Sequence, residues 1–171
     1  DGMGAITYTW SNGKTGTTIT LDQNDVGNEI TVTASYTDGK GTNESVTSAA
    51  TSVVTNVNDD PTGSVTISGT ATQGEVLTAS NTLGDVDGMG AITYTWSNGK
   101  TGESITLDQN DVGNEITVTA SYTDGKGTQE SVTSAATNTV ANVNDDPSGK
   151  PQIVGTTSKG SVLTADTDTI T

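Results

Sequence analysis

Two copies of an acidic hexapeptide hold the residues best suited to chemistry in this chain. Asn-Val-Asn-Asp-Asp-Pro occupies positions 56–61 and recurs at positions 142–147. Adjacent carboxylates repel one another, so each cluster disfavours a packed environment unless a cation neutralises it. Asp and Asn oxygens are ligands that a hard cation such as Ca²⁺ takes, and proline fixes φ at the exit of the segment. Each hexapeptide therefore indicates either a calcium-stiffened joint between domains or an acidic linker that stays solvated.

The composition excludes several functional classes. The chain has 171 residues and a formal charge of −15, with 21 acidic residues and 6 basic residues, all of them Lys. Because it has no His and no Cys, it lacks the usual ligands of zinc, copper and iron and the groups of Ser-His-Asp or Cys-His catalysis. The acidic balance argues against nucleic acid or an anionic membrane as partner. No apolar run could span a bilayer and no signal peptide begins the chain, so we expect no membrane insertion.

The amount of apolar residues and their pattern along the sequence lead to opposite expectations about folding. Leu, Ile and Val make up 30 of 171 residues and Phe is absent, which together with the high net charge is typical of disorder. The apolar residues nevertheless alternate cleanly between regularly spaced turns, as they do in folded β-proteins. Bound metal would reconcile the two observations, because it would neutralise the charge that opposes compaction.

The chain is built on an internal repeat of 86 residues. Residues 1–61 align with residues 87–147 without a gap and share 55 identities, and residues 62–85 share nine identities with residues 148–171. We therefore expect three parts. Residues 1–61 are the rear of a first repeat that lacks its first two strands, residues 62–147 are one complete repeat, and residues 148–171 are the first two strands of a third.

Strict alternation of apolar and polar residues predicts short strands across the complete repeat. The expected strands are residues 64–68, 75–80, 91–96, 103–107, 115–123 and 128–140. Asn-Gly and Asp-Gly pairs suit the turns between them, and no stretch has helical spacing. Trp96 and Tyr122 fall on inward-facing positions, so we expect both in the core. These features predict an all-β chain of immunoglobulin-like Greek-key β-sandwich repeats in a linear array.

This topology predicts which acidic residues meet at a joint. The loops after the second and fifth of these strands lie at the end where the chain enters a repeat, and the turn before the fifth strand lies where it leaves. The linker should therefore meet two loops of the repeat that it enters and one turn of the repeat that it leaves. The carboxylates gathered at the first joint would be those of Asp59, Asp60, Asp85, Asp87, Asp124, Asp22 and Asp25. Seven carboxylates are too many to coexist without cations.

The second joint is expected to use the same chemistry. Asp108 and Asp111 should serve it together with Asp145 and Asp146, although Asp111 could instead close its own turn through the backbone. Asp38 completes the set of candidate calcium ligands. The Asp-x-Asp-Gly spacing of residues 85–88 lets two side chains converge while Gly makes the turn, as calcium loops do.

The repeat resembles a known class of module. Asp85-Val86-Asp87-Gly88, Ile92-Thr93-Tyr94-Thr95-Trp96 and Tyr122-Thr123-Asp124 are similar to the bacterial immunoglobulin-like and cadherin-like repeats in the extender regions of giant RTX-type adhesins. The resemblance covers the whole chain. It implies a secreted, extracellular location on the bacterial cell surface.

The linker is also similar to the calcium-binding linker of cadherins, which has the pattern Asp-x-Asn-Asp-Asn. Asn56 stands in place of the first Asp and Asp60 in place of the last Asn. Asp59 and Asp145 keep the central Asp, so the resemblance transfers a calcium-ligand role to these two residues alone.

Several functions follow from these observations. The leading hypothesis is a spacer of a surface adhesin or matrix fibre, in which each repeat contacts its neighbours. Residues 148–171 could also complement residues 1–61 of a second molecule and so form a head-to-tail filament, unless the segment is simply cut from a longer array. Exposed Thr pairs such as Thr93 and Thr95 could bind carbohydrate or a mineral, or merely suit a solvated strand. We expect no enzyme, because the paired carboxylates lie in turns and linkers rather than in a cleft.

Overall fold

The computed structural model describes residues 2–171 and shows an all-β chain, as predicted from the sequence. Its only helix among these residues is a single 3-10 turn, η1 (Gln23–Asp25). The strands are β1 (Thr7–Trp10), β2 (Val32–Thr37), β3 (Asn43–Thr47), β4 (Val65–Ser68), β5 (Val76–Asn81), β6 (Thr93–Trp96), β7 (Ser104–Thr106), β8 (Val118–Thr123), β9 (Gln129–Thr133), β10 (Gln152–Gly155) and β11 (Leu163–Asp166). No helix in the described chain has the length and apolar character needed to cross a membrane.

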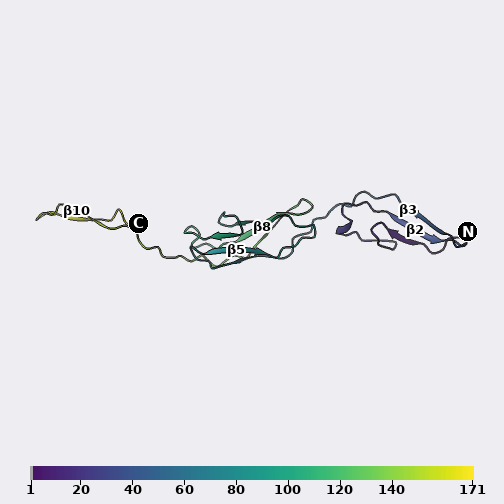
Figure 1. Cartoon of the computed structure of the whole chain (residues 1–171), viewed down its shortest axis with the longest axis horizontal. Coiled ribbons are helices and arrows are strands. Elements are labelled where there is room, and N and C mark those ends of the chain that lie inside the picture. Colours follow the sequence, from purple (N-terminus) through teal and green to yellow (C-terminus); the bar gives the residue numbers. More distant parts are fainter. Residues whose placement is uncertain (1) are drawn as a thin grey trace.

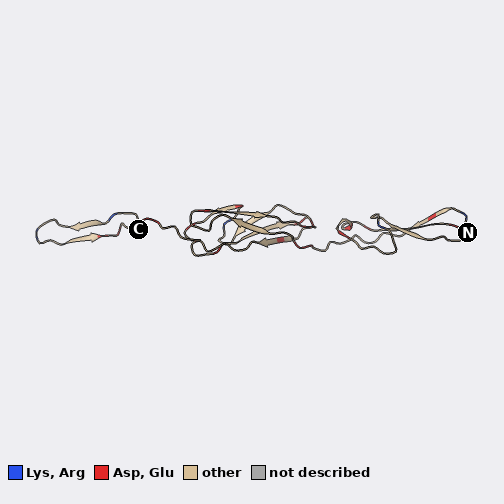
Figure 2. Cartoon of the chain, turned by 90° about the horizontal axis from the view of Figure 1, so that it is seen from below, with Lys and Arg blue, Asp and Glu red and all other residues tan. Residues whose placement is uncertain are grey.

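The strands form four antiparallel sheets, with the orders β1-β2-β3, β4-β5-β7, β6-β8-β9 and β10-β11. The first sheet lies within residues 2–61, the next two within residues 62–147, and the last within residues 148–171. Figure 1 shows these three groups one after another along the long axis, with the N-terminal sheet and the β10–β11 hairpin at opposite ends. Acidic residues recur along the chain and Lys residues are sparse (Figure 2).

Residues 62–147 enclose a single apolar core in a sandwich-like arrangement. The sheet β4-β5-β7 contributes Val65, Leu77, Ala79 and Ile105, and the sheet β6-β8-β9 contributes Trp96, Val118 and Ala120. Side chains alternate along a strand, so each sheet turns one face inward and leaves the other to solvent. A parallel bridge between Thr72 and Ala141 joins the start of the repeat to its last segment.

The two aromatic residues expected in the core are both there. Trp96 and Tyr122 are almost fully buried, and the Trp96 indole N–H donates to the carbonyl of Gly102 at 2.8 Å. The polar atom of the largest core side chain is therefore satisfied. Because both rings face inward, neither offers a surface platform on which a sugar could stack.

The predicted last strand, residues 128–140, is wrong in length, because β9 ends at Thr133. Beyond it the Ser134 and Thr137 hydroxyls accept hydrogen bonds from the backbone N–H groups of Val118 and Ile116. These hydroxyls replace backbone carbonyls as acceptors and interrupt the regular ladder, although the segment still runs beside its neighbour. The alternation of apolar and polar residues does not reveal that a side-chain hydroxyl takes the place of a backbone acceptor.

Candidate functional site at the first joint

Two loops of residues 62–147 are hydrogen-bonded to each other near the first linker. One follows β5 and carries Asp85 and Asp87, and the other joins β8 to β9 and begins with Asp124. The Asp85 carboxylate accepts from the backbone N–H of Asp87 at 2.8 Å, a local turn that Asp favours. Gly88 follows with φ near +92°, which a residue with a side chain rarely adopts. The Gly88 carbonyl then accepts from the N–H of Gly125 at 3.1 Å, which binds one loop to the other.

Asp87 connects three segments that are far apart in the sequence. Its side chain is only 4% exposed. One carboxylate oxygen accepts from the backbone N–H of Asp59 in the linker at 2.9 Å. The other accepts from the Gln23 side chain of the preceding repeat at 2.7 Å, and Gln23 also donates to the Asn56 side chain at 3.2 Å. The predicted meeting of the linker with the 85–88 loop and the 22–25 turn is thus present, through Asp87 and Gln23.

Asp124 has a buried carboxylate oxygen without a partner. The side chain is 6% exposed. Its Oδ1 accepts from the backbone N–H groups of Lys126 and Thr128 at 2.8 and 2.7 Å, while its Oδ2 has no hydrogen-bond partner within residues 2–171. Burial raises the pKa of Asp124, but the backbone N–H donors outweigh it and hold the pKa below its ordinary value. The group is therefore a buried anion with one oxygen free, which is costly unless a cation or a donor reaches it.

The Asp85 carboxylate, in the loop after β5, contacts Tyr122 near the end of β8. The Tyr122 hydroxyl donates to Asp85 at 2.7 Å. Burial, followed by the hydrogen bond to Asp85, raises the pKa of the Tyr122 phenol far above its ordinary value, and the charges of Glu130 and Asp124 act in the same direction. The phenol therefore stays a neutral donor surrounded by three carboxylates.

Sequence reasoning missed Glu130 and Gln23. The Asn58 side chain of the linker donates to the Glu130 carboxylate at 2.8 Å, so β9, as well as the 85–88 loop, contacts the linker. Glu130 lies directly opposite Tyr122 in the β8–β9 register, and that register could have revealed it. Gln23 offers no such signal, because its role depends on how far its side chain reaches across the joint.

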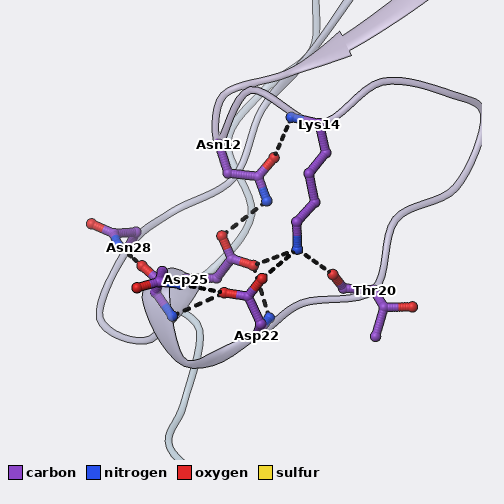
Figure 3. A network of polar contacts seen from close by, with 7 residues as sticks. Asn12, Lys14, Thr20, Asp22, Asp25 and Asn28 are labelled. Atoms are coloured by element: carbon purple, nitrogen blue, oxygen red, sulfur yellow. Dashed lines mark hydrogen bonds and ion pairs between the residues drawn. The ribbon is translucent and has the colours of Figure 1, made fainter.

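The carboxylates of Asp22 and Asp25 face their own repeat. Both pair with Lys14, at 2.7 and 3.6 Å, and Asp25 also accepts from the side chain of Asn12 and the N–H of Asp22, both at 2.9 Å. Figure 3 shows these side chains converging on the Lys14 ammonium at the capped η1 turn. Of this turn only Gln23, which lies between the two carboxylates, extends to the joint.

Asp108 and Asp111 repeat this arrangement in residues 62–147. They pair with Lys100 at 2.8 and 3.2 Å, and Asp111 accepts from the N–H of Asp108 at 2.9 Å. Backbone turn closure, which the sequence had left open as an alternative role for Asp111, is thus present. The pKa of Asp108 is lowered chiefly by its hydrogen bond to Lys100, and that of Asp111 is lowered because hydrogen bonds outweigh the opposing effect of burial.

The remaining candidates are less enclosed. Asp38 accepts from the N–H groups of Lys40 and Thr42, just as Asp124 does from its own loop. The linker residues Asp59, Asp60, Asp145 and Asp146 are all exposed. Across residues 2–171 no three acidic, His or Cys side chains lie together in a way that could hold a metal ion.

No known protein family, characterised protein or solved structure matches the chain. The features of the joint are therefore the basis for its function. The joint provides carboxylate and amide oxygens that can act as metal ligands, including a buried carboxylate oxygen without a hydrogen-bond partner. It also receives contacts from two successive repeats. Oxygen donors of this kind suit Ca²⁺ rather than a transition metal.

Proposed function

We propose that this chain is a spacer segment of a long secreted protein of the bacterial cell surface or matrix, with repeats held end to end by Ca²⁺. The observation that carries the proposal is the bridging role of Asp87, which binds the linker through Asp59 and the preceding repeat through Gln23. A residue buried between two repeats fixes their mutual orientation. In a linear array, stiffness then depends on these joints.

The strand order supports an immunoglobulin-like repeat. Residues 62–147 pair the first, second and fourth strands in one sheet and the third, fifth and sixth in the other. The parallel bridge of Thr72 to Ala141 joins the first segment to the edge of the second sheet, as a chain that switches sheets would. This order is the one expected for a Greek-key repeat of the immunoglobulin class, in which loops cluster at the two ends of the sandwich.

The chemistry of the joint residues supports calcium, although no three of their carboxylates lie close enough together in this structure to hold an ion. Asp85, Asp87 and Asp124 would supply carboxylates from the entered repeat, and Asn58, Asp59 and Asp60 would supply linker oxygens. The unpartnered Asp124 Oδ2 is the clearest indication, because a buried anionic oxygen without a donor suits a cation. Bound calcium would neutralise part of the negative charge that opposes close approach of the repeats.

Calorimetric titration of the whole chain with calcium, combined with small-angle scattering, tests this proposal. We expect binding to wild-type chain, and an increase in its bending when EDTA removes the ion. Asp124→Asn should abolish binding at the first joint. Asp38→Asn is the matched control, because Asp38 occupies the same loop of the first repeat but is only half-buried. Absence of binding, or equal losses in both variants, contradicts the proposal.

A further inference from the structure

The first and last segments of the complete repeat are hydrogen-bonded to each other. Thr72 and Ala141 form a parallel bridge, and Ala141 bonds to the residue on each side of Thr72. Its N–H donates to the Ala71 carbonyl and its carbonyl accepts from the Gln73 N–H, both at 2.9 Å. The Gln73 side-chain oxygen also accepts from the N–H of Val143 at 3.2 Å. We call the contact made by these three hydrogen bonds the seam.

The last segment is also held on the side away from the seam. Val140, one residue before Ala141, is 2% exposed and belongs to the apolar core. Its N–H donates to the Asn114 carbonyl at 2.9 Å, and its carbonyl accepts from the Gly113 N–H at 3.0 Å. The last segment therefore cannot leave the repeat without breaking these bonds and exposing a core side chain, which costs free energy.

The segment that follows the first linker is bonded to β5 and to the loop after it. The Thr62 carbonyl and N–H both bond to Gly84, at 3.1 and 2.8 Å, and the Ser64 carbonyl accepts from the Thr82 N–H at 3.0 Å. Strand β4 then pairs with β5 along its whole length. A pull on the linker of residues 56–61 thus acts on β4 along the direction of the strand.

The direction of the chain determines how tension reaches the seam. Residues 139–141 run toward the second linker, residues 142–147, and residues 71–73 run the same way because the bridge is parallel. The groups of sheets lie one after another along the long axis (Figure 1), so tension pulls the second linker forward and β4 backward. The two segments must then slide past each other, and the bonds of the seam resist together. Pulling the segments apart sideways would instead break these bonds one after another.

We propose that residues 62–147 carry tension along the chain and that the seam is the contact that resists it. The rate of unfolding under force depends on the barrier to unfolding rather than on equilibrium stability, so a few bonds that must break first can set it. Gln73 extends the seam, because its side chain holds Val143 at the start of the second linker. This function belongs to the interior of one repeat, so it holds or fails independently of calcium at the joints.

Pulling the whole chain in two directions tests the proposal while every bond of the seam stays intact. The chain has no native Cys, so paired Cys substitutions at exposed positions provide attachment points for single-molecule force spectroscopy. Asp60→Cys with Asp145→Cys pulls along the seam, whereas Glu75→Cys with Asp145→Cys pulls its two segments apart from the same end. We expect the first pair to need a force at least about twofold higher at equal pulling speed, with calcium or with EDTA. Equal forces overturn the proposal.

Single substitutions test the bonds of the seam in the first attachment pair. Ala141→Pro removes one backbone donor and should lower the unfolding force at least about twofold. Gln73→Ala removes only the side-chain acceptor, so it should lower the force by less, and it stays informative if Ala141→Pro does not fold. Gln129→Ala is the matched control, since Gln129 also makes a side-chain hydrogen bond, to Thr123, but lies outside the seam. An unchanged force in Gln73→Ala, or an equal loss in Gln129→Ala, overturns the proposal.

Discussion

The carboxylate of Asp87 accepts a hydrogen bond from the backbone N–H of Asp59, 2.9 Å away and 28 residues earlier in the chain. The same side chain accepts from Gln23, 64 residues away. A single buried residue thus joins the linker to the repeats on both of its sides. This relationship, rather than the acidity of the linker alone, gives the joint a defined geometry.

Removing the Asp87 carboxylate should therefore release the linker. In Asp87→Ala we expect the Asp59 amide to exchange with solvent at least about tenfold faster, because its acceptor is gone. Hydrogen exchange resolved to the linker measures this. The control is Asp60→Ala, whose side chain makes no hydrogen bond within the described chain. If exchange at Asp59 is unchanged in Asp87→Ala, the bond does not restrain the linker.

Core stability should depend on β5. Leu77 is fully buried, and Leu77→Ala should lower the free energy of unfolding by about 2–5 kcal/mol. Val76→Ala, one residue away on the exposed face, should change it by no more than about 0.5 kcal/mol. Urea unfolding followed by Trp fluorescence measures both, in a Trp10→Phe background that leaves Trp96 as the only reporter. Similar losses for the two variants would contradict the assigned inward face.

A feature of this architecture could be predicted when the residues that form it lie close together in the sequence, and not when they lie far apart. Period-two alternation predicted the strands around Trp96 and Tyr122, because inward and outward positions are a local property of a strand. The end of β9 was mispredicted, because the Ser134 hydroxyl takes over a backbone hydrogen bond from another strand.

The joint was predictable only in part for the same reason. Topology indicated that the Asp85–Gly88 loop would lie near the linker. The roles of Gln23 and Glu130 depend instead on the reach of single side chains between segments that are 64 and 72 residues apart. The pairing of Asp22 and Asp25 with Lys14 likewise follows from the exact turn geometry, which residue spacing does not determine.

The hydroxyl of Ser134 should contribute measurably to the free energy of unfolding. It accepts from the buried N–H of Val118 at 3.1 Å, so Ser134→Ala leaves that donor unpaired and should cost about 1–3 kcal/mol. Thermal or urea unfolding measures the loss. Ser131→Ala provides the comparison, since Ser131 is exposed and its hydroxyl has no partner among the described residues. Equal stability of the two variants would show that Val118 N–H finds another acceptor.

The Lys100 cluster should make stability depend on pH in one direction. The pKa values of Asp108 and Asp111 are lowered from about 3.8. Their contribution to the free energy of unfolding is therefore complete above that pH, and it is lost as the pH falls through the folded-state pKa values. The pKa of Lys100 is raised above 10.5, so its contribution is lost only above that pH.

Lys100→Met should consequently be less stable than wild type at neutral pH, and the difference should shrink below about pH 4. Unfolding measured at several pH values checks this, with Lys126→Met as the control, because Lys126 forms no ion pair within residues 2–171. A difference that stays constant down to low pH would mean that the cluster stabilises through packing rather than charge.

Asp124→Asn should lose more stability in calcium than in EDTA. Backbone N–H donors hold the pKa of Asp124 below its ordinary value, so the anion stabilises the fold even without the ion, and the variant should melt lower than wild type in EDTA. With free calcium 100-fold above the dissociation constant, wild type alone gains about 2.7 kcal/mol through the unpartnered Oδ2, so the difference in melting temperature should widen. Asp38→Asn should show no such widening. If the difference for Asp124→Asn is the same in both conditions, Oδ2 binds no calcium.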